Sequence, residues 1–143
     1  MTVRITQWNA DKFIKRVPLV LTNYGIKITP LLQESIKAKV YEWPVFTRRK
    51  VGLYSGRAVE PGRRDIVDTG VLLGSQSAPK IRPNSLTIVW QAPYSGAVLN
   101  GGFLVGTVRN AYIAPARDWI TPVLIAEPPA QFFAREWRKI GGA

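Results

Sequence analysis

Residues 11–43 decide the fold: they open with DKFIKRVPLVL at 11–21 and close with LLQESIKAKVYEW at 31–43. Asp11 is a favourable N-cap for a helix. The apolar side chains of the first half recur at helical spacing on one face: Phe13, Ile14, Val17 and Leu21. Those of the second half form another stripe: Leu32, Ile36, Val40 and Trp43. This periodicity predicts a long N-terminal helix over 11–43.

Prolines interrupt this helical pattern. A proline inside a helix removes a backbone donor and collides with the preceding turn, so Pro18 should kink or restart the helix. Thr29 followed by Pro30 is the pattern of an N-cap with proline in the first helical position. Pro44 ends the run. We therefore expect one long helix over 11–43, either kinked or broken at the internal prolines.

The remaining elements are shorter. Asp68 or Thr69 is expected to cap a short helix that carries Val71 and Leu72. The alternation over 85–90 predicts a strand that pairs with 79–82 through a Pro83-Asn84 turn. After the hairpin we expect one helical turn at 93–99, then β-rich segments at 103–108 and 111–115, and a final helix at 130–140. Thr121-Pro122 again reads as cap plus proline, and Pro128-Pro129 breaks the helix that begins there.

This order of elements predicts the α+β class, with a long N-terminal helix, a small antiparallel β-sheet, short helices and a C-terminal helix packed on one face. We expect a single domain spanning 1–143, because no linker or internal repeat divides the chain. On the final helix, Phe133, Trp137 and Ile140 fall at helical spacing. Trp119, Phe133 and Trp137 are therefore the predicted anchors for packing of the C-terminal helix, as core or subunit contacts rather than base-stacking platforms.

Composition excludes several kinds of chemistry. The chain has 143 residues and a net charge of +11, and it contains neither cysteine nor histidine. Thiol nucleophiles, disulfides, thiolate metal sites and Ser-His-Asp triads are thus ruled out. We expect no enzymatic activity, no metal and no cofactor. The sequence also has no run of about 20 apolar residues and no secretion signal, so no membrane association is expected.

A basic loop is predicted at 44–66, where glycines and prolines break any regular element. Its candidate cations are Arg48, Arg49, Lys50, Arg57, Arg63 and Arg64. One interpretation is a solvated excursion. The other is a basic arm that orders against a phosphate backbone or an acidic neighbouring subunit. The positive charge by itself also fits a basic, non-sequence-specific DNA-binding protein, such as a packaging or nucleoid factor.

The string Asp68-Thr69-Gly70 is similar to the Asp-Thr-Gly of aspartic proteases, whose retroviral members are dimers in which two aspartates share a proton. Val71 stands where a small residue is expected there, and a helical N-terminal third does not belong in that all-β fold. A dimeric aspartic protease is therefore the remote alternative.

Three strings in order resemble a different family, the tail-completion or head–tail joining (neck) proteins of long-tailed bacteriophages. The strings are VDTGVLLGS at 67–75, VWQAPYSGAVLNG at 89–101 and PARDWITPVL at 115–124. The residues that carry the resemblance are Asp68, Thr69, Gly70, Ser75, Pro93, Tyr94, Gly101, Ala116, Arg117 and Pro122. The chain departs from the family at Asp118-Trp119, where Pro-Phe is common, and at Asn100, where an acidic residue often precedes the glycine.

The resemblance implies a non-enzymatic virion protein that assembles in the host cytoplasm as a homo-oligomeric ring, usually a hexamer, at the head–tail junction. It implies the connector or adaptor and the tail-tube proteins as partners, with the genome passing through the ring. Cations of the 44–66 loop would then face the DNA channel or a partner, since such contacts attract phosphate without reading sequence.

Overall fold

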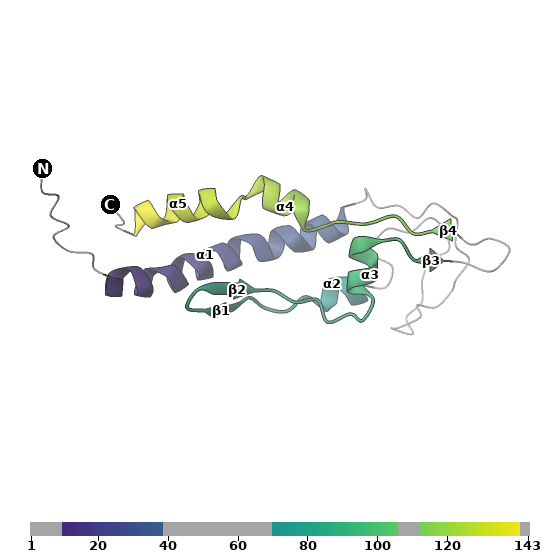
Figure 1. Ribbon diagram of the computed structural model, residues 1–143, viewed down its shortest axis with the longest axis horizontal. Coiled ribbons are helices and arrows are strands. Elements are labelled where there is room, and N and C mark those ends of the chain that lie inside the picture. Colours follow the sequence, from purple (N-terminus) through teal and green to yellow (C-terminus); the bar gives the residue numbers. More distant parts are fainter. Residues whose placement is uncertain (1–9, 39–69, 106–111, 141–143) are drawn as a thin grey trace, which may run out of the picture.

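The computed structural model describes residues 10–38, 70–105 and 112–140, and it has the expected α+β fold. Helix α1 (Ala10–Lys37) runs along the molecule, with the C-terminal helices on one side and a β-hairpin on the other (Figure 1). The C-terminal helices are α4 (Thr121–Ala126) and α5 (Pro129–Lys139), and α5 lies antiparallel to α1. No helix among these residues combines the length and the apolar character that crossing a membrane requires.

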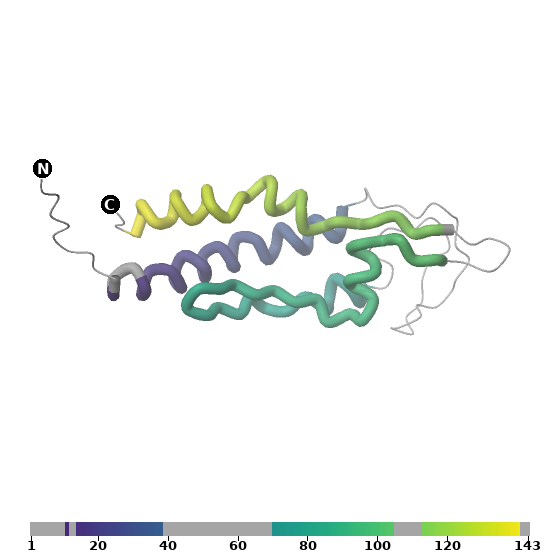
Figure 2. The backbone as a smooth tube through the Cα atoms, viewed as in Figure 1, coloured from purple at the N-terminus to yellow at the C-terminus, as the bar shows by residue number. Residues whose placement is uncertain are grey.

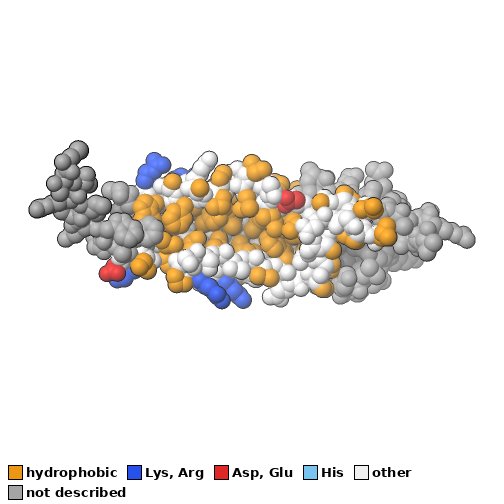
Figure 3. All heavy atoms as spheres, in the orientation of Figure 1, with side chains coloured by type: hydrophobic (Ala, Val, Ile, Leu, Met, Phe, Trp, Pro, Cys, Tyr) orange, Lys and Arg blue, Asp and Glu red, His pale blue; other side chains and the backbone are white. Residues whose placement is uncertain are grey.

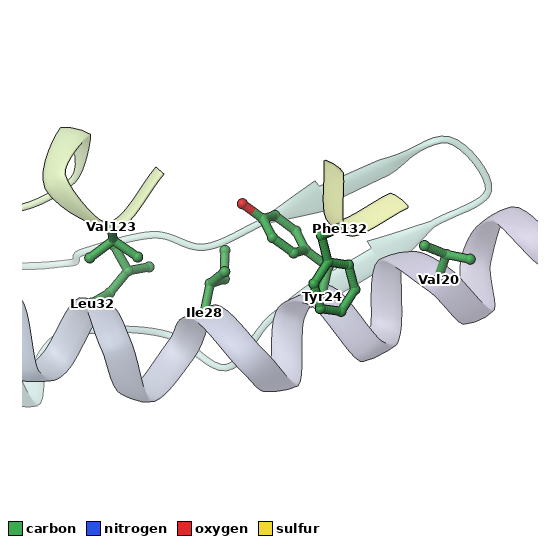
Figure 4. Packing of buried hydrophobic residues seen from close by; sticks show 6 residues of the cluster. All are labelled: Val20, Tyr24, Ile28, Leu32, Val123 and Phe132. Carbon is green, nitrogen blue, oxygen red and sulfur yellow. The ribbon is translucent and has the colours of Figure 1, made fainter. Parts of the chain in front are cut away.

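Helix α1 contributes a row of buried side chains spaced four residues apart: Val20, Tyr24, Ile28, Leu32 and Ile36. Such a row is inclined to the helix axis, so its partners change along the helix. Tyr24 meets Phe132 of α5 with ring centroids 5.0 Å apart, and further along, Leu32 faces Val123 of α4 (Figure 4). We call the first four residues of the row, with Val123 and Phe132, the Val20 cluster.

The prolines do not divide α1, so the helix restart expected at Thr29-Pro30 is wrong, and Pro18 does not restart the helix either. The Thr29 hydroxyl does not cap a new helix; it donates back to the Gly25 carbonyl at 2.6 Å. Proline in a helix interior costs about 3 kcal/mol. The buried row extends to both sides of Pro30, so packing against α4 and α5 keeps the two halves in one helix. The helix ends at Lys37, and Val40 and Trp43 lie outside the described residues.

Strands β1 (Lys80–Arg82) and β2 (Ser85–Thr87) form the predicted antiparallel hairpin, with Ile81 opposite Leu86 and the turn at Pro83-Asn84. From Leu86 to Gln91, half-buried and exposed residues alternate, as the sequence predicted. The hairpin lies beside α1 (Figure 2). Their close approach requires Gly25, because a Cβ there would lie 3.0 Å from the Pro79 Cβ and 3.2 Å from Leu86 Cδ1.

The other elements gather at the C-terminal end of α1 (Figure 1). They are α2 (Val71–Gly74), α3 (Ser95–Asn100), β3 (Leu104–Val105) and β4 (Tyr112–Ile113). The N-cap of α2 is Gly70, which provides no side chain, instead of the expected Asp68 or Thr69. Strands β3 and β4 pair with each other, so the described strands form two separate ribbons instead of one small sheet.

The C-terminal segment follows the predicted break, because α4 ends at Ala126 and α5 begins at Pro129. The predicted stripe of Phe133, Trp137 and Ile140 packs against the Val20 cluster, but it is only partly buried. Phe132, which the sequence analysis did not single out, is the buried aromatic residue of α5, while Phe133 and Trp137 are half-buried and stack with centroids 6.0 Å apart.

Candidate functional site

The three strings that carry the family resemblance meet around Trp119. The buried residues there are Ile36, Leu72, Ala92 and Trp119, which we call the Trp119 cluster. Around them pack half-buried side chains from all three strings: Val71, Leu73, Trp90, Tyr94, Val98, Leu99 and Ile120. Trp119 is 1% exposed and meets the edge of Trp90 with ring centroids 5.7 Å apart. Strings separated by tens of residues in the chain therefore form one packed unit.

Backbone hydrogen bonds join the strings. The N–H of Gln91 donates to the Ser75 carbonyl at 3.1 Å, which ties the first string to the second. The N–H of Arg117 donates to the Val98 carbonyl at 3.1 Å, which ties the second to the third. Because backbone partners fix relative position, these bonds set the register of the three strings independently of side-chain identity.

Gly101 is placed where only glycine fits. It follows α3 with φ +64°, and a Cβ there would lie 2.3 Å from the Ala116 backbone nitrogen. The next residue, Gly102, also has a positive φ of 78°, yet a Cβ there would meet nothing within 4 Å. Gly101 thus allows the second string to pass directly over the third.

Asp118 supplies the polar cap that the sequence analysis assigned to Thr121. Its Oδ1 accepts hydrogen bonds from the N–H groups of Ile120 at 3.0 Å and Thr121 at 2.9 Å. Thr121 is instead the first residue of α4. Hydrogen bonds from the Thr121 side chain and from the two N–H groups lower the pKa of the Asp118 carboxyl. This departure from the family pattern therefore has a local role in starting α4.

Arg117 lies in the interior, with only 2% of its surface exposed. Its Nη1 donates to the Pro115 carbonyl at 3.3 Å. A buried guanidinium is stable only with hydrogen-bonding partners, so Arg117 belongs to the packing of this unit and is not a surface cation.

The other residues that the sequence analysis singled out fall into three groups by position. Ser75, Pro93, Tyr94, Ala116 and Pro122 all lie in or beside the Trp119 cluster strings. Phe133 and Trp137 lie on α5 and are not part of that cluster. The predicted cations and two motif residues lie outside the described residues: Arg48, Arg49, Lys50, Arg57, Arg63, Arg64, Asp68 and Thr69.

An exposed apolar pair lies next to the Trp119 cluster. Leu104 of β3 is 74% exposed and Ile113 of β4 is 67% exposed, and the two are cross-strand partners. The ribbon continues directly from the second string and leads directly into the third. Its two arms are joined next to the strands, where Gly102 N–H donates to the Ala114 carbonyl at 2.8 Å and Ala114 N–H to the Phe103 carbonyl at 2.9 Å. Sequence periodicity did not find the pair, because two-residue strands give too short an alternation.

A second feature missed from the sequence is an ionic junction at the α4–α5 bend. The Glu127 carboxylate pairs with Lys27 at 3.6 Å and with Arg135 at 3.3 Å. The Tyr24 hydroxyl donates to the Glu127 carbonyl at 2.9 Å. Burial, followed by the charge of Glu127, raises the pKa of Tyr24. The junction fixes the bend against α1, and its residues are too distant in sequence for any local pattern to reveal it.

No group of three or more acidic side chains that could hold a metal occurs among the residues that the structure describes. The aspartic-protease string ends at Gly70, and helix α2 begins directly after it. Comparisons with models of protein families, with curated proteins and with solved structures found no match. The function is accordingly argued from the site itself.

Proposed function

We propose that this chain is a structural virion protein that forms a closed homo-oligomeric ring, a hexamer, at the head–tail junction of a long-tailed phage. Its role is that of a tail-completion (terminator) protein or neck connector around the DNA channel. Its partners are further copies of itself, the connector or adaptor, and the tail-tube protein. The proposal assigns it no catalytic residue and no cofactor.

The observation that carries this proposal is the convergence of the three strings around Trp119. A resemblance spread over 67–124 has more weight when its parts form one structural unit than when they lie on unrelated surfaces. Gly101, Arg117 and Pro122 are motif residues, and each has a specific position in that unit: a close backbone passage, a buried guanidinium and the first turn of α4.

The exposed pair Leu104 and Ile113 supports a contact between subunits. A ring needs two different complementary patches on each subunit. A two-stranded ribbon is marginally stable in water by itself. A neighbouring subunit that covers this pair would bury apolar surface and stabilise the ribbon at the same time.

The test compares assembly of the wild type with that of a Leu104→Asp/Ile113→Asp variant. Mass photometry at high protein concentration, and negative-stain images of the protein added to phage tails, should show rings for the wild type. The double variant should remain monomeric while keeping its helical circular dichroism. Ile125→Asp is the matched control, because Ile125 is 72% exposed on α4 and lies outside the ribbon. Wild-type protein that stays monomeric alone and with tails would contradict the proposal.

A basic, non-sequence-specific DNA-binding protein is the second candidate, favoured by the net charge of +11. Such a protein would bind duplex DNA tightly as a free chain, with an affinity that falls steeply as salt rises. A ring subunit would bind duplex weakly until it assembles. Measuring duplex affinity as a function of salt on monomeric protein separates the two candidates.

A further inference from the structure

An open apolar groove lies between the N-terminal half of α1, the β1–β2 turn and α5. One part, of about 630 Å³, is lined by Ile14 and Val17 of α1, Pro83 and Asn84 of the turn, and Phe133 of α5. A second part, of about 570 Å³, continues along α5 and is lined by Ala130, Phe133, Ala134, Trp137 and Arg138. Both parts share Phe133, so we treat them as one α1–α5 groove.

The groove has an apolar floor. Phe133 and Trp137 stack nearly parallel, with an angle of 14° between their rings, and both pack on one side against the Val20 cluster. Ile14 is 59% exposed at its edge. Figure 3 shows hydrophobic side chains gathered in a band between the C-terminal helices and the hairpin. An apolar surface of this kind, with polar edges, is typical of a protein-binding groove.

Cations lie along two edges of this band, and Figure 3 also shows acidic side chains near its ends. Arg138 lines the groove, and the Arg16 guanidinium carbon lies 5.9 Å from the centre of the Trp137 ring. Exposed Arg82 directly precedes Pro83 in the hairpin, and Figure 3 shows Lys and Arg side chains at the two edges of the band. Of the two acidic residues of α1 itself, Asp11 lies at this end, three residues before Ile14, and Glu34 lies toward the other end.

The carboxylates of the C-terminal segment belong to another face of α5. Glu136 lines a separate hollow with Asn23, and its Oε1 accepts from Lys139 at 2.6 Å. Glu127 is paired with Lys27 and Arg135, which line that same hollow. These pairs leave the α1–α5 groove with predominantly positive edges.

We propose that the α1–α5 groove receives an acidic amphipathic helix of a partner protein. Apolar residues on one face of that helix would cover Ile14, Phe133 and Trp137, while flanking Asp and Glu would meet Arg16, Arg82 and Arg138. This proposal does not depend on the ring, because it uses neither the β3–β4 ribbon nor the Trp119 cluster.

Charge and shape select this occupant over others. A second copy that used this same face would set Arg16 and Arg138 against their own counterparts, which opposes association at this groove. Duplex DNA presents a phosphate surface with no apolar group for the aromatic floor. The apolar lining is an open strip formed by α1, the hairpin turn and α5, and one face of an amphipathic helix can lie along such a strip.

The experiment uses fluorescence anisotropy with the full chain and two labelled synthetic peptides. Both peptides carry leucines at i, i+3, i+4 and i+7; one has Glu at the other positions and its counterpart has Lys. We expect the Glu peptide to bind at least about tenfold more tightly than the Lys peptide. Arg82→Glu/Arg138→Glu should weaken its binding about tenfold and flatten the salt dependence.

Matched substitutions locate the binding site. Ile14→Ser should weaken binding several-fold, whereas Ile26→Ser, at a residue 67% exposed elsewhere on α1, should not. Lys37→Glu, at the far end of α1, changes the net charge as much as Arg82→Glu or Arg138→Glu made singly, and it is the control for each of those single variants. Ile14 and Ile26 are both largely exposed, so neither change should unfold the protein, which circular dichroism checks.

Three results would overturn the proposal. The Lys peptide binding as tightly as the Glu peptide would remove the argument from charge. Equal losses from Ile14→Ser and Ile26→Ser would place binding elsewhere. A dimer in sedimentation velocity that Ile14→Ser abolishes would assign the groove to a second copy of this chain.

Discussion

The Val20 cluster and the Trp119 cluster both use helix α1, but they are built in different ways. The Val20 cluster consists mainly of one row along a single helix, covered by α4 and α5. The Trp119 cluster combines one α1 residue with residues from three short strings, which backbone hydrogen bonds hold together. The first arrangement provides the stable body of the molecule. The second brings close together the residues that suggest a function, along with the exposed Leu104–Ile113 pair.

The largest loss of stability is expected from Gly101→Ala. This variant tests whether the Trp119 cluster depends on the close approach of the second and third strings at Gly101. Its Cβ would lie 2.3 Å from a backbone nitrogen, so the second and third strings would have to separate. We expect a loss of more than about 4 kcal/mol in unfolding free energy, or no folded protein.

Gly102→Ala is the control for this change. It has a similar positive φ but open space, so it should cost only about 1–2 kcal/mol. Urea denaturation followed by circular dichroism measures both. Equal losses of stability would mean that the positive φ of the glycine, and not the close approach of the Ala116 backbone, makes glycine necessary at position 101.

Next in size are Trp119→Ala and Phe132→Ala, one from each cluster. Each removes a large buried aromatic side chain and should cost about 3–5 kcal/mol. Because α1 passes through both clusters, each variant should still unfold in one transition, with near- and far-ultraviolet circular dichroism changing together. Two separate transitions in either variant would show that the clusters fold independently.

The two clusters also differ in how far the sequence predicts them. The spacing of Leu32 and Ile36 indicated the buried face of α1, and the alternation over 85–90 indicated the hairpin. The helix restart at Thr29-Pro30 was predicted wrongly, because the local preference of proline is weaker than the packing on both sides of Pro30. Phe132 was missed because adjacent Phe132 and Phe133 fit a helical stripe in either rotation, and the position of α1 decides between them.

Prediction from sequence was weaker still for the Trp119 cluster. Leu72 and Ala92 lie in strings too short for a periodic signal, and their meeting with Ile36 of α1 depends on contacts between distant segments. The pattern Thr121-Pro122 suggested a cap, but the Asp118 carboxylate, which accepts from the N–H groups of Ile120 and Thr121, provides the polar contact at the start of α4. Only the resemblance to a family connected the three strings before their positions were known.

Pro30→Ala should change the unfolding free energy by a smaller amount and in the opposite direction. The change measures how much the proline destabilises α1, which packing of the Val20 cluster holds in one helix. Pro30 is exposed, so little packing is lost, and alanine restores a backbone N–H for the Ile26 carbonyl. We expect a gain of about 1–2 kcal/mol in unfolding free energy, after the more flexible unfolded chain is counted. Ile26→Ala, at an exposed residue one turn away, should change stability by less than about 0.5 kcal/mol. A loss of stability in Pro30→Ala would show that the proline ring contributes packing that outweighs the missing hydrogen bond.

The smallest change in unfolding free energy is expected for Asp118, whose charged carboxylate lies beside the Trp119 cluster. Its carboxylate accepts N–H groups at the start of α4, so Asp118→Ala should cost about 1 kcal/mol at neutral pH. The folded pKa is lowered from the ordinary value of 3.8, so this contribution is complete above that pH and is lost as pH falls through the lower folded value. The difference between wild type and Asp118→Ala in urea midpoint should therefore be constant near neutral pH and shrink below about pH 4. Glu34→Ala, which removes an exposed carboxylate from α1, should show no such convergence of comparable size. A difference that persists unchanged in acid would mean that Asp118 acts through its shape and not through its charge.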